Sequence, residues 1–163
     1  MKYQINNILY ATDLGPHGPE VFRHAMGFSR AFQAKIYVLH VMEALNDYAE
    51  SLLANYMSDE MLNKASEEGF EQVRHEMENR ANKICEDSGL TRDELEAMVG
   101  DVRVIQGAPF EVILDEAERV HADIIVIGSH GQSTVSKMLL GSVAQKVSMK
   151  SKVPVLLVPI SAD

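Results

Sequence analysis

Five short apolar runs recur along the chain, and amphipathic stretches separate them. Each run is rich in Val, Ile or Leu, and most end near Gly, Pro or Asp, which is typical of buried β-strands. The five predicted strands are Ile8 to Thr12, Lys35 to Val41, Val102 to Gln106, Asp123 to Ile127 and Val153 to Val158. Because nearly continuous apolar strands have no polar face, we expect helices to cover both sides of their sheet.

Helical spacing of apolar residues marks the stretches between the predicted strands. Pro19 suits the first position of a helix, and Pro109 opens another. Met61 to Asp87 is predicted to be a long amphipathic helix that Gly89 ends. The stretch from Met42 to Asp59 is ambiguous, and we interpret it as an irregular or partly helical excursion.

The alternation of strands and helices predicts an α/β fold with a doubly wound, five-stranded parallel sheet of order 3-2-1-4-5. A length of 163 residues fits a single domain, 1–163. Ligands of such folds bind beyond the carboxyl ends of the strands, where the winding reverses. Asp13, Val41, Gly107 and the stretch Gly128 to Gly131 all follow predicted strands, so we expect them at this edge.

The most informative motif is Gly128-Ser129-His130-Gly131, which is followed by Gly141-Ser142-Val143. Glycine lets backbone N–H groups close on an anion, and a helix N-terminus attracts one. Ser142 to Gln145 has the form of a capping box, with Ser142 as N-cap and Gln145 at N3. The motif therefore predicts a cradle for a nucleotide phosphate. Alternatives remain open: a tight turn with positive φ for the glycines, and a pure helix cap for Ser142.

Other nucleotide and catalytic signatures are absent from the sequence. There is no Walker A string, no G-x-G-x-x-G fingerprint and no G-x-S-x-G elbow. The six histidines lack metal-binding spacing, and His130 is interpreted as an exposed loop residue. Lys137 could reach a phosphate, although a solvated helix face is the alternative.

Net charge and the number of cysteines indicate which partners and which cellular compartment to expect. A formal net charge of −9 argues against nucleic acid and anionic membrane as partners. The single cysteine, Cys85, cannot form an internal disulfide. The sequence opens without a signal peptide and has no apolar run of about 20 residues. We therefore expect a cytoplasmic protein.

The string Gly128-x2-Gly131-x9-Gly141-Ser142 after a strand resembles the ATP-binding motif of the universal stress protein family. The resemblance covers nearly the whole chain. Further segments similar to the family are Asn7 to Asp13, Leu39 to Val41, Gly107 to Pro109, Ala122 to Gly131, Leu139 to Val143 and Val153 to Val158. The first turn departs from it, because many relatives carry Ser where this chain has Gly15 and near Gly18.

Members of the family that keep the glycine motif bind ATP, so the resemblance implies a nucleotide site for ATP, ADP or AMP. Carried over by position, Asp13 and Val41 would lie against the adenosine, Gly128 would contact the ribose, and the later motif residues would hold phosphates. The full expected set is Ala11, Asp13, Val41, Gly107, Ile127, Gly128, Ser129, Gly131, Gly141, Ser142 and Val143. Asp13 would also hold a divalent cation that offsets its charge near the phosphates; its alternative is a turn residue.

The function implied is that of a cytoplasmic ATP-binding stress protein, a dimeric sensor or adaptor with no catalytic residue assigned. We expect a homodimer through the apolar edge strand Val153 to Val158, together with a protein partner that the sequence does not name. One alternative is a slow ATP hydrolase or phosphotransferase, for which a base and an arginine finger are missing from the sequence pattern. Another is an interaction module that binds no nucleotide.

Overall fold

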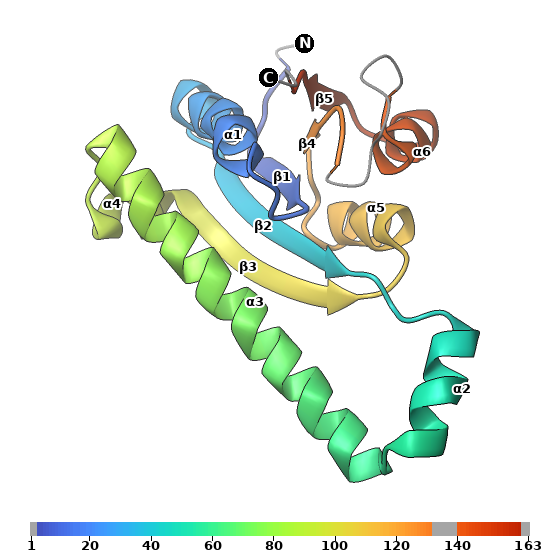
Figure 1. Cartoon of the computed structure of the whole chain (residues 1–163). Coiled ribbons are helices and arrows are strands. Elements are labelled where there is room, and N and C mark those ends of the chain that lie inside the picture. The colour runs from blue at the N-terminus through green and yellow to red at the C-terminus, as the bar shows by residue number, and fades with distance from the viewer. Residues whose placement is uncertain (1–2, 132–139, 161–163) are drawn as a thin grey trace.

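The computed structural model describes residues 3–131 and 140–160 and is an α/β fold around one five-stranded sheet (Figure 1). The order is β3-β2-β1-β4-β5, and every neighbouring pair is parallel. The strands are β1 (Asn7–Thr12), β2 (Lys35–Met42), β3 (Val99–Gln106), β4 (Ile124–Gly128) and β5 (Val155–Val158). The predicted fold class and strand order are confirmed.

The helices of the described residues connect these strands. They are α1 (Gly18–Phe32), α2 (Asp47–Tyr56), α3 (Asp59–Ser88), α4 (Arg92–Met98), α5 (Pro109–Arg119) and α6 (Ser142–Lys150). Pro19 and Pro109 stand in the first turns of α1 and α5, and Gly89 ends α3 with φ 68°. These three boundary predictions are correct, because proline and left-handed glycine are strong local signals.

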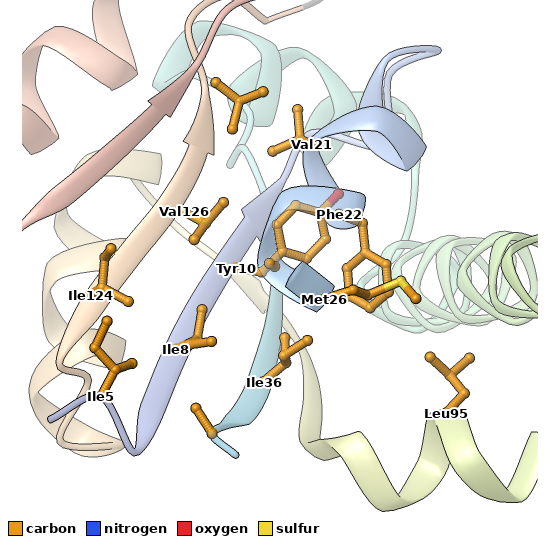
Figure 2. Packing of buried hydrophobic residues seen from close by; sticks show 13 residues of the cluster. Ile5, Ile8, Tyr10, Val21, Phe22, Met26, Ile36, Leu95, Ile124 and Val126 are labelled. Atoms are coloured by element: carbon orange, nitrogen blue, oxygen red, sulfur yellow. The ribbon is translucent and has the colours of Figure 1, made fainter. Parts of the chain in front are cut away.

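Two apolar layers sandwich the sheet. On one face, Ile8, Tyr10 and Val126 pack with residues of α1 and α4, and the rings of Tyr10 and Phe22 lie 5.1 Å apart (Figure 2). On the other face, strand residues such as Leu9 and Ile125 pack against α5 and α6. Burial on both faces explains why the strands are nearly continuous apolar runs.

Several elements differ from the predictions, most of all at the starts of β3 and β5 and in the segments before them. β3 begins at Val99 rather than Val102, and β5 begins at Val155 rather than Val153. At the start of β3, a side chain on Gly100 would lie 3.0 Å from the Tyr37 ring, so the glycine makes room for β2. Helix α4 was not predicted, and the ambiguous excursion contains the regular helix α2, capped by Asn46.

Helix α2 and the N-terminal part of α3 extend beyond the sheet from the carboxyl ends of β2 and β3 (Figure 1). We call residues 43–73 the α2–α3 arm. Neither α2 nor α3 contains a fully buried residue. The C-terminal part of α3 does reach the body of the protein, where Ala81 and Ile84 pack against the core.

Within residues 3–131 and 140–160, no helix has the length and apolar character that crossing a membrane requires.

Candidate functional site

The carboxyl edge of the sheet brings the glycine motif and the start of α6 together. The backbone N–H of Ser129 donates to the Val158 carbonyl at 2.8 Å, which continues the pairing of β4 with β5. The N–H of Gly141 then donates to the Ser129 carbonyl at 2.9 Å. The two halves of the motif, separated in sequence, are therefore joined directly through backbone.

Close approach explains the glycines of this motif. A Cβ on Gly141 would lie 3.3 Å from the Ser129 carbonyl oxygen, and one on Gly131 would lie 3.3 Å from Oδ2 of Asp13. A Cβ on Gly128 would meet Ile160 at 2.6 Å. Neither Gly128 nor Gly131 has a positive φ, so the alternative of a left-handed turn is wrong. The missing side chains let these backbone segments approach closely, as the predicted cradle requires.

The N-terminus of α6 differs from the predicted capping box. Gly141 is the N-cap, Ser142 is the first helical residue, and no side chain caps the helix. The first intrahelical bond runs from the Gln145 N–H to the Gly141 carbonyl at 2.8 Å. The preceding N–H groups of Ser142, Val143 and Ala144 therefore have no acceptor inside the helix. These N–H groups and the positive end of the helix dipole form an anion-binding geometry.

Asp13 lies across from the glycine loop. It follows β1, is exposed, and accepts a hydrogen bond from the Gly15 N–H at 2.8 Å through Oδ1. The turn interpretation is thus correct for one carboxylate oxygen, while the other oxygen faces Gly131. The same side chain shapes the first turn and borders the cradle.

Arg80 of α3 is a residue of this region that the sequence analysis missed. Its guanidinium donates to the Gly15 carbonyl at 2.8 Å and to the Leu14 carbonyl, and its Nε donates to Glu76 at 2.8 Å. Leu14 has a φ of 59°, which is unusual for a residue with a Cβ. Arg80 therefore holds a strained turn next to Asp13.

The first turn also explains Gly18. A Cβ at Gly18 would lie 3.1 Å from Arg80 and 3.3 Å from the Thr12 hydroxyl. That hydroxyl accepts a hydrogen bond from the Leu14 N–H at 3.0 Å. A larger residue at Gly18 would press on the arginine that supports the turn.

The remaining predicted residues lie around the same edge. The side chains of Ala11 and Ile127 are buried in the layer under α5 and α6, and Val41 is half-buried there. The side chains of Ala11 and Ile127 therefore belong to the apolar core. The Gly107 N–H donates to the Met42 carbonyl at 2.9 Å, and a Cβ on Gly107 would lie 2.8 Å from Val112.

Ser129 and His130 form a small polar cluster. The Ser129 hydroxyl accepts a hydrogen bond from the Ile160 N–H at 3.1 Å and lies 2.9 Å from Nδ1 of His130. His130 is half-buried, so its interpretation as an exposed residue is wrong. Its Nε2 is buried and has no hydrogen-bond partner among the described residues. Lys137 lies outside the described residues.

A divalent cation would rely on Asp13 and on ligands from outside the protein. No group of three or more His, Cys, Asp or Glu side chains able to hold a metal occurs within the two described ranges. Mg²⁺ commonly takes one or two carboxylates and completes its shell with water and phosphate oxygens. A single carboxylate such as Asp13 therefore fits a cation that is also bound by phosphate oxygens better than a cation held by protein side chains alone.

This geometry defines a doubly wound α/β protein whose glycine motif and α6 N-terminus meet at the carboxyl edge of its sheet. The model of the "Universal stress protein family" matches residues 4–159, and the chain belongs to that family.

Individual relatives agree over nearly the whole length. The chain is 29% identical over 158 residues to "Universal stress protein MJ0577" of Methanocaldococcus jannaschii, covering 97% of each. It is 32% identical over 155 residues to a universal stress protein of Thermus aquaticus, covering 93% of this chain and 96% of the relative. The solved structure of MJ0577 matches with a TM-score of 0.75 at 26% identity, covering 98% of this chain and 99% of that chain.

A universal stress protein solved in complex with cAMP shares the fold. Its TM-score is 0.60 at 21% identity, and the match covers 97% of this chain and 99% of that chain.

Proposed function

We propose that this universal stress protein binds ATP, or ADP or AMP, at the carboxyl edge of its sheet. The carrying observation is the convergence of Gly131 and Gly141, whose missing side chains open a cradle of backbone N–H groups at the start of α6. Phosphates rest against this cradle, and the adenosine lies toward Asp13 and Val41. The family and the relative solved with cAMP support an adenine nucleotide as the ligand.

Electrostatics divide the site into two parts. The N–H groups of Ser142 and Val143, with the dipole of α6, stabilise the phosphate charge. Asp13 opposes it, and a divalent cation bound by this carboxylate and the phosphates offsets the repulsion. Ser129 contributes by fixing the β4 end of the loop, because its backbone is bonded to Val158 and Gly141.

We propose further that the protein is a cytoplasmic sensor or adaptor that acts as a homodimer. Its output is a change in the surface presented to a partner rather than a chemical product, which requires different nucleotide affinities in two states. A dedicated hydrolase is a weaker candidate. Arg80, the arginine nearest the first turn, is engaged by loop carbonyls and Glu76, so it is not placed as an arginine finger.

The test compares nucleotide binding in the wild type and two glycine variants. Gly131→Val places methyl groups against Asp13 and the phosphate path, so we expect at least a tenfold loss of ATP affinity, which is about 1.4 kcal/mol. Gly27→Val is the matched control, because a Cβ at Gly27 meets nothing within 4 Å.

Calorimetry measures both affinities, and mass spectrometry identifies any nucleotide released from the purified protein. Equal ATP affinity in the wild type and Gly131→Val would exclude the cradle as the phosphate site. No binding of any adenine nucleotide to the wild type would favour the alternative of an interaction module without nucleotide.

A further inference from the structure

Helix α2 carries an apolar stripe that faces solvent. Tyr48 and Tyr56 are 74% and 84% exposed, and Leu52 between them is 41% exposed. Leu45, directly before the helix, is 52% exposed and continues the stripe with a spacing of three residues. The adjoining residues Ala49 and Leu53 are half-buried, so the packing of α2 uses a different set of side chains.

Nothing within the described chain covers this stripe. The α2–α3 arm extends away from the sheet, and neither of its helices contains a buried residue (Figure 1). The arm leaves the sheet at β2 and β3, whereas β5 is the opposite edge strand. A homodimer on β5 would therefore leave the stripe uncovered. Two tyrosines with large exposed rings are typical of binding hot spots rather than of an ordinary solvated helix.

The charge of the arm is strongly one-sided. Residues 43–73 contain eight carboxylates and one basic side chain, Lys64. This stretch accounts for most of the formal net charge of −9. Asp47 and Glu50 lie on α2 and Glu43 precedes it, and the helix has no lysine or arginine. A partner that approaches the arm meets this negative charge, so a cationic partner is favoured.

Charge disfavours a second copy of this chain as the partner, because two arms that each carry eight carboxylates and one lysine repel one another. An anionic membrane is disfavoured by the same carboxylates.

We propose that the α2–α3 arm docks a cationic amphipathic helix of another protein. The apolar face of that helix packs on Tyr48, Leu52 and Tyr56, and its Lys or Arg residues are attracted by the net negative charge of the arm. This is the recognition of one amphipathic helix by the apolar face of another. The inference deepens the proposed adaptor function and rests on it, but it does not depend on nucleotide binding.

The test uses a defined probe, a fluorescent peptide of about 18 residues, or five helical turns, with Leu on one face and Lys elsewhere. A peptide of the same pattern with Glu in place of Lys is the control. Fluorescence anisotropy with the full chain, with and without nucleotide, measures both affinities. We expect the Lys peptide to bind in the micromolar range and the Glu peptide not to bind.

Two pairs of variants separate the arm from the rest of the acidic surface. Tyr48→Ser with Tyr56→Ser should weaken the Lys peptide at least tenfold, whereas Tyr48→Phe with Tyr56→Phe should restore it. Met149→Ser is the apolar control, because Met149 is 78% exposed on α6. Glu43→Gln with Glu50→Gln should lower the affinity for the Lys peptide and make it less dependent on salt. The charge control, Glu86→Gln with Asp87→Asn, should leave both unchanged. Because all these side chains are exposed, far-UV circular dichroism should be unchanged.

Several outcomes would overturn the docking proposal. One is failure of the Lys peptide to bind the wild type. Another is that the double serine variant binds the Lys peptide as tightly as the wild type does. A third is that Glu86→Gln with Asp87→Asn weakens binding as much as Glu43→Gln with Glu50→Gln does. Sedimentation tests self-association. If the wild type is a dimer and the double serine variant is a monomer, the stripe on α2 binds a second copy of this chain instead of another protein. Failure of nucleotide binding in calorimetry would refute the proposed nucleotide site and leave these peptide results standing.

Discussion

At the scale of single residues, the site region depends on groups that the core holds in place. Tyr10 is one of them: its ring is 5% exposed and packs on Phe22, and its hydroxyl donates to the Gly18 carbonyl at 3.0 Å. Burial raises the pKa of Tyr10 to about 12, because the phenolate would lose its hydration inside the core. The neutral hydroxyl thus links β1 to the start of α1, next to the first turn.

This raised pKa predicts a loss of stability at high pH. Below pH 10, Tyr10 is protonated in both states, and its contribution to stability is complete. Between the unfolded pKa near 10 and the folded pKa of about 12, only the unfolded chain releases the proton, so the free energy of unfolding falls by roughly 2 to 3 kcal/mol. Urea titrations from pH 9 to 12 measure this fall.

Tyr10→Phe removes the titration and should flatten the fall in that range, although it also costs stability at neutral pH by removing the hydrogen bond from its hydroxyl to the Gly18 carbonyl. Tyr56→Phe is the control, because Tyr56 is 84% exposed. A fall of the same size in Tyr10→Phe would show that other groups cause the alkaline loss.

Ser142 gives a second prediction at this scale. Because Gly141 is the N-cap and the Ser142 side chain makes no capping bond, Ser142→Ala should change the free energy of unfolding by less than the roughly 1 kcal/mol of a lost cap. If the hydroxyl contacts phosphate, the variant should weaken ATP more than adenosine. Thermal unfolding measures the change in stability, and calorimetry measures the affinities for ATP and adenosine. If Ser142→Ala weakens both ligands equally, the Ser142 hydroxyl does not contact phosphate.

At the scale of elements, α3 supports the first turn from a distance. Arg80 is on α3, and its guanidinium reaches two carbonyls of the turn 65 and 66 residues earlier in the sequence. With only 23% of its side chain exposed, it is better shielded than the ion pairs along the rest of the helix. The position of the turn beside Asp13 therefore depends on the position of α3.

Replacing Arg80 should weaken nucleotide binding without unfolding the protein. In Arg80→Met, the Leu14 and Gly15 carbonyls lose the guanidinium and the Gly15 carbonyl keeps only the Gly18 N–H, so the strained turn relaxes and we expect about a tenfold loss of ATP affinity. Amide hydrogen exchange of residues 13–18 should become faster. Arg80→Lys should recover part of the affinity.

Arg74→Met is the matched control for Arg80, because Arg74 is 73% exposed and pairs only with Glu71 in the described structure. Unchanged ATP affinity and unchanged exchange in Arg80→Met would mean that the arginine plays no part in holding the turn.

The elements also show how far sequence patterns reach. The strands, their order and the meeting of Asp13 with the glycine motif could be predicted, because apolar runs and parallel topology fix which strand ends share an edge. The start of α6 could not, because the bond from the Gly141 N–H to the Ser129 carbonyl sets the helix start, and local propensity favoured Ser142.

Two other differences have different causes. Helix α4 is short, but Thr91 and Glu94 form a capping box whose sequence was readable. The sequence around Arg80 does not predict its role, because its contacts with Leu14 and Gly15 form only when α3 packs beside the first turn. Long-range polar contacts of this kind depend on tertiary structure.

At the scale of the whole molecule, the sheet has two edges of different character. β3 lies beside α3, with an open groove of about 400 Å³ between them. β5 is the other edge, and Val155, Leu156 and Leu157 remain half-buried in the single chain. An apolar edge strand with unpaired backbone groups on one side favours pairing with another strand.

The proposed homodimer on β5 predicts that Leu156→Lys gives a monomer or an insoluble protein, because it places a charge in a self-complementary strand pair. Val102→Lys is the control on the opposite edge, where Val102 is 50% exposed. Sedimentation measures the association, and circular dichroism checks the fold. A wild-type monomer at micromolar concentration would contradict the dimer.

The absence of buried side chains from α2 has a consequence for divergence within the family. Substitutions on a surface that contributes nothing to the core change the free energy of unfolding by only about 0.5 kcal/mol in either direction. Exposed residues of α2 can therefore be exchanged almost freely, whereas a change at Gly131 or Gly141 meets backbone or Asp13. Specificity for a partner can thus be rewritten on this scaffold while the ligand cradle stays as it is.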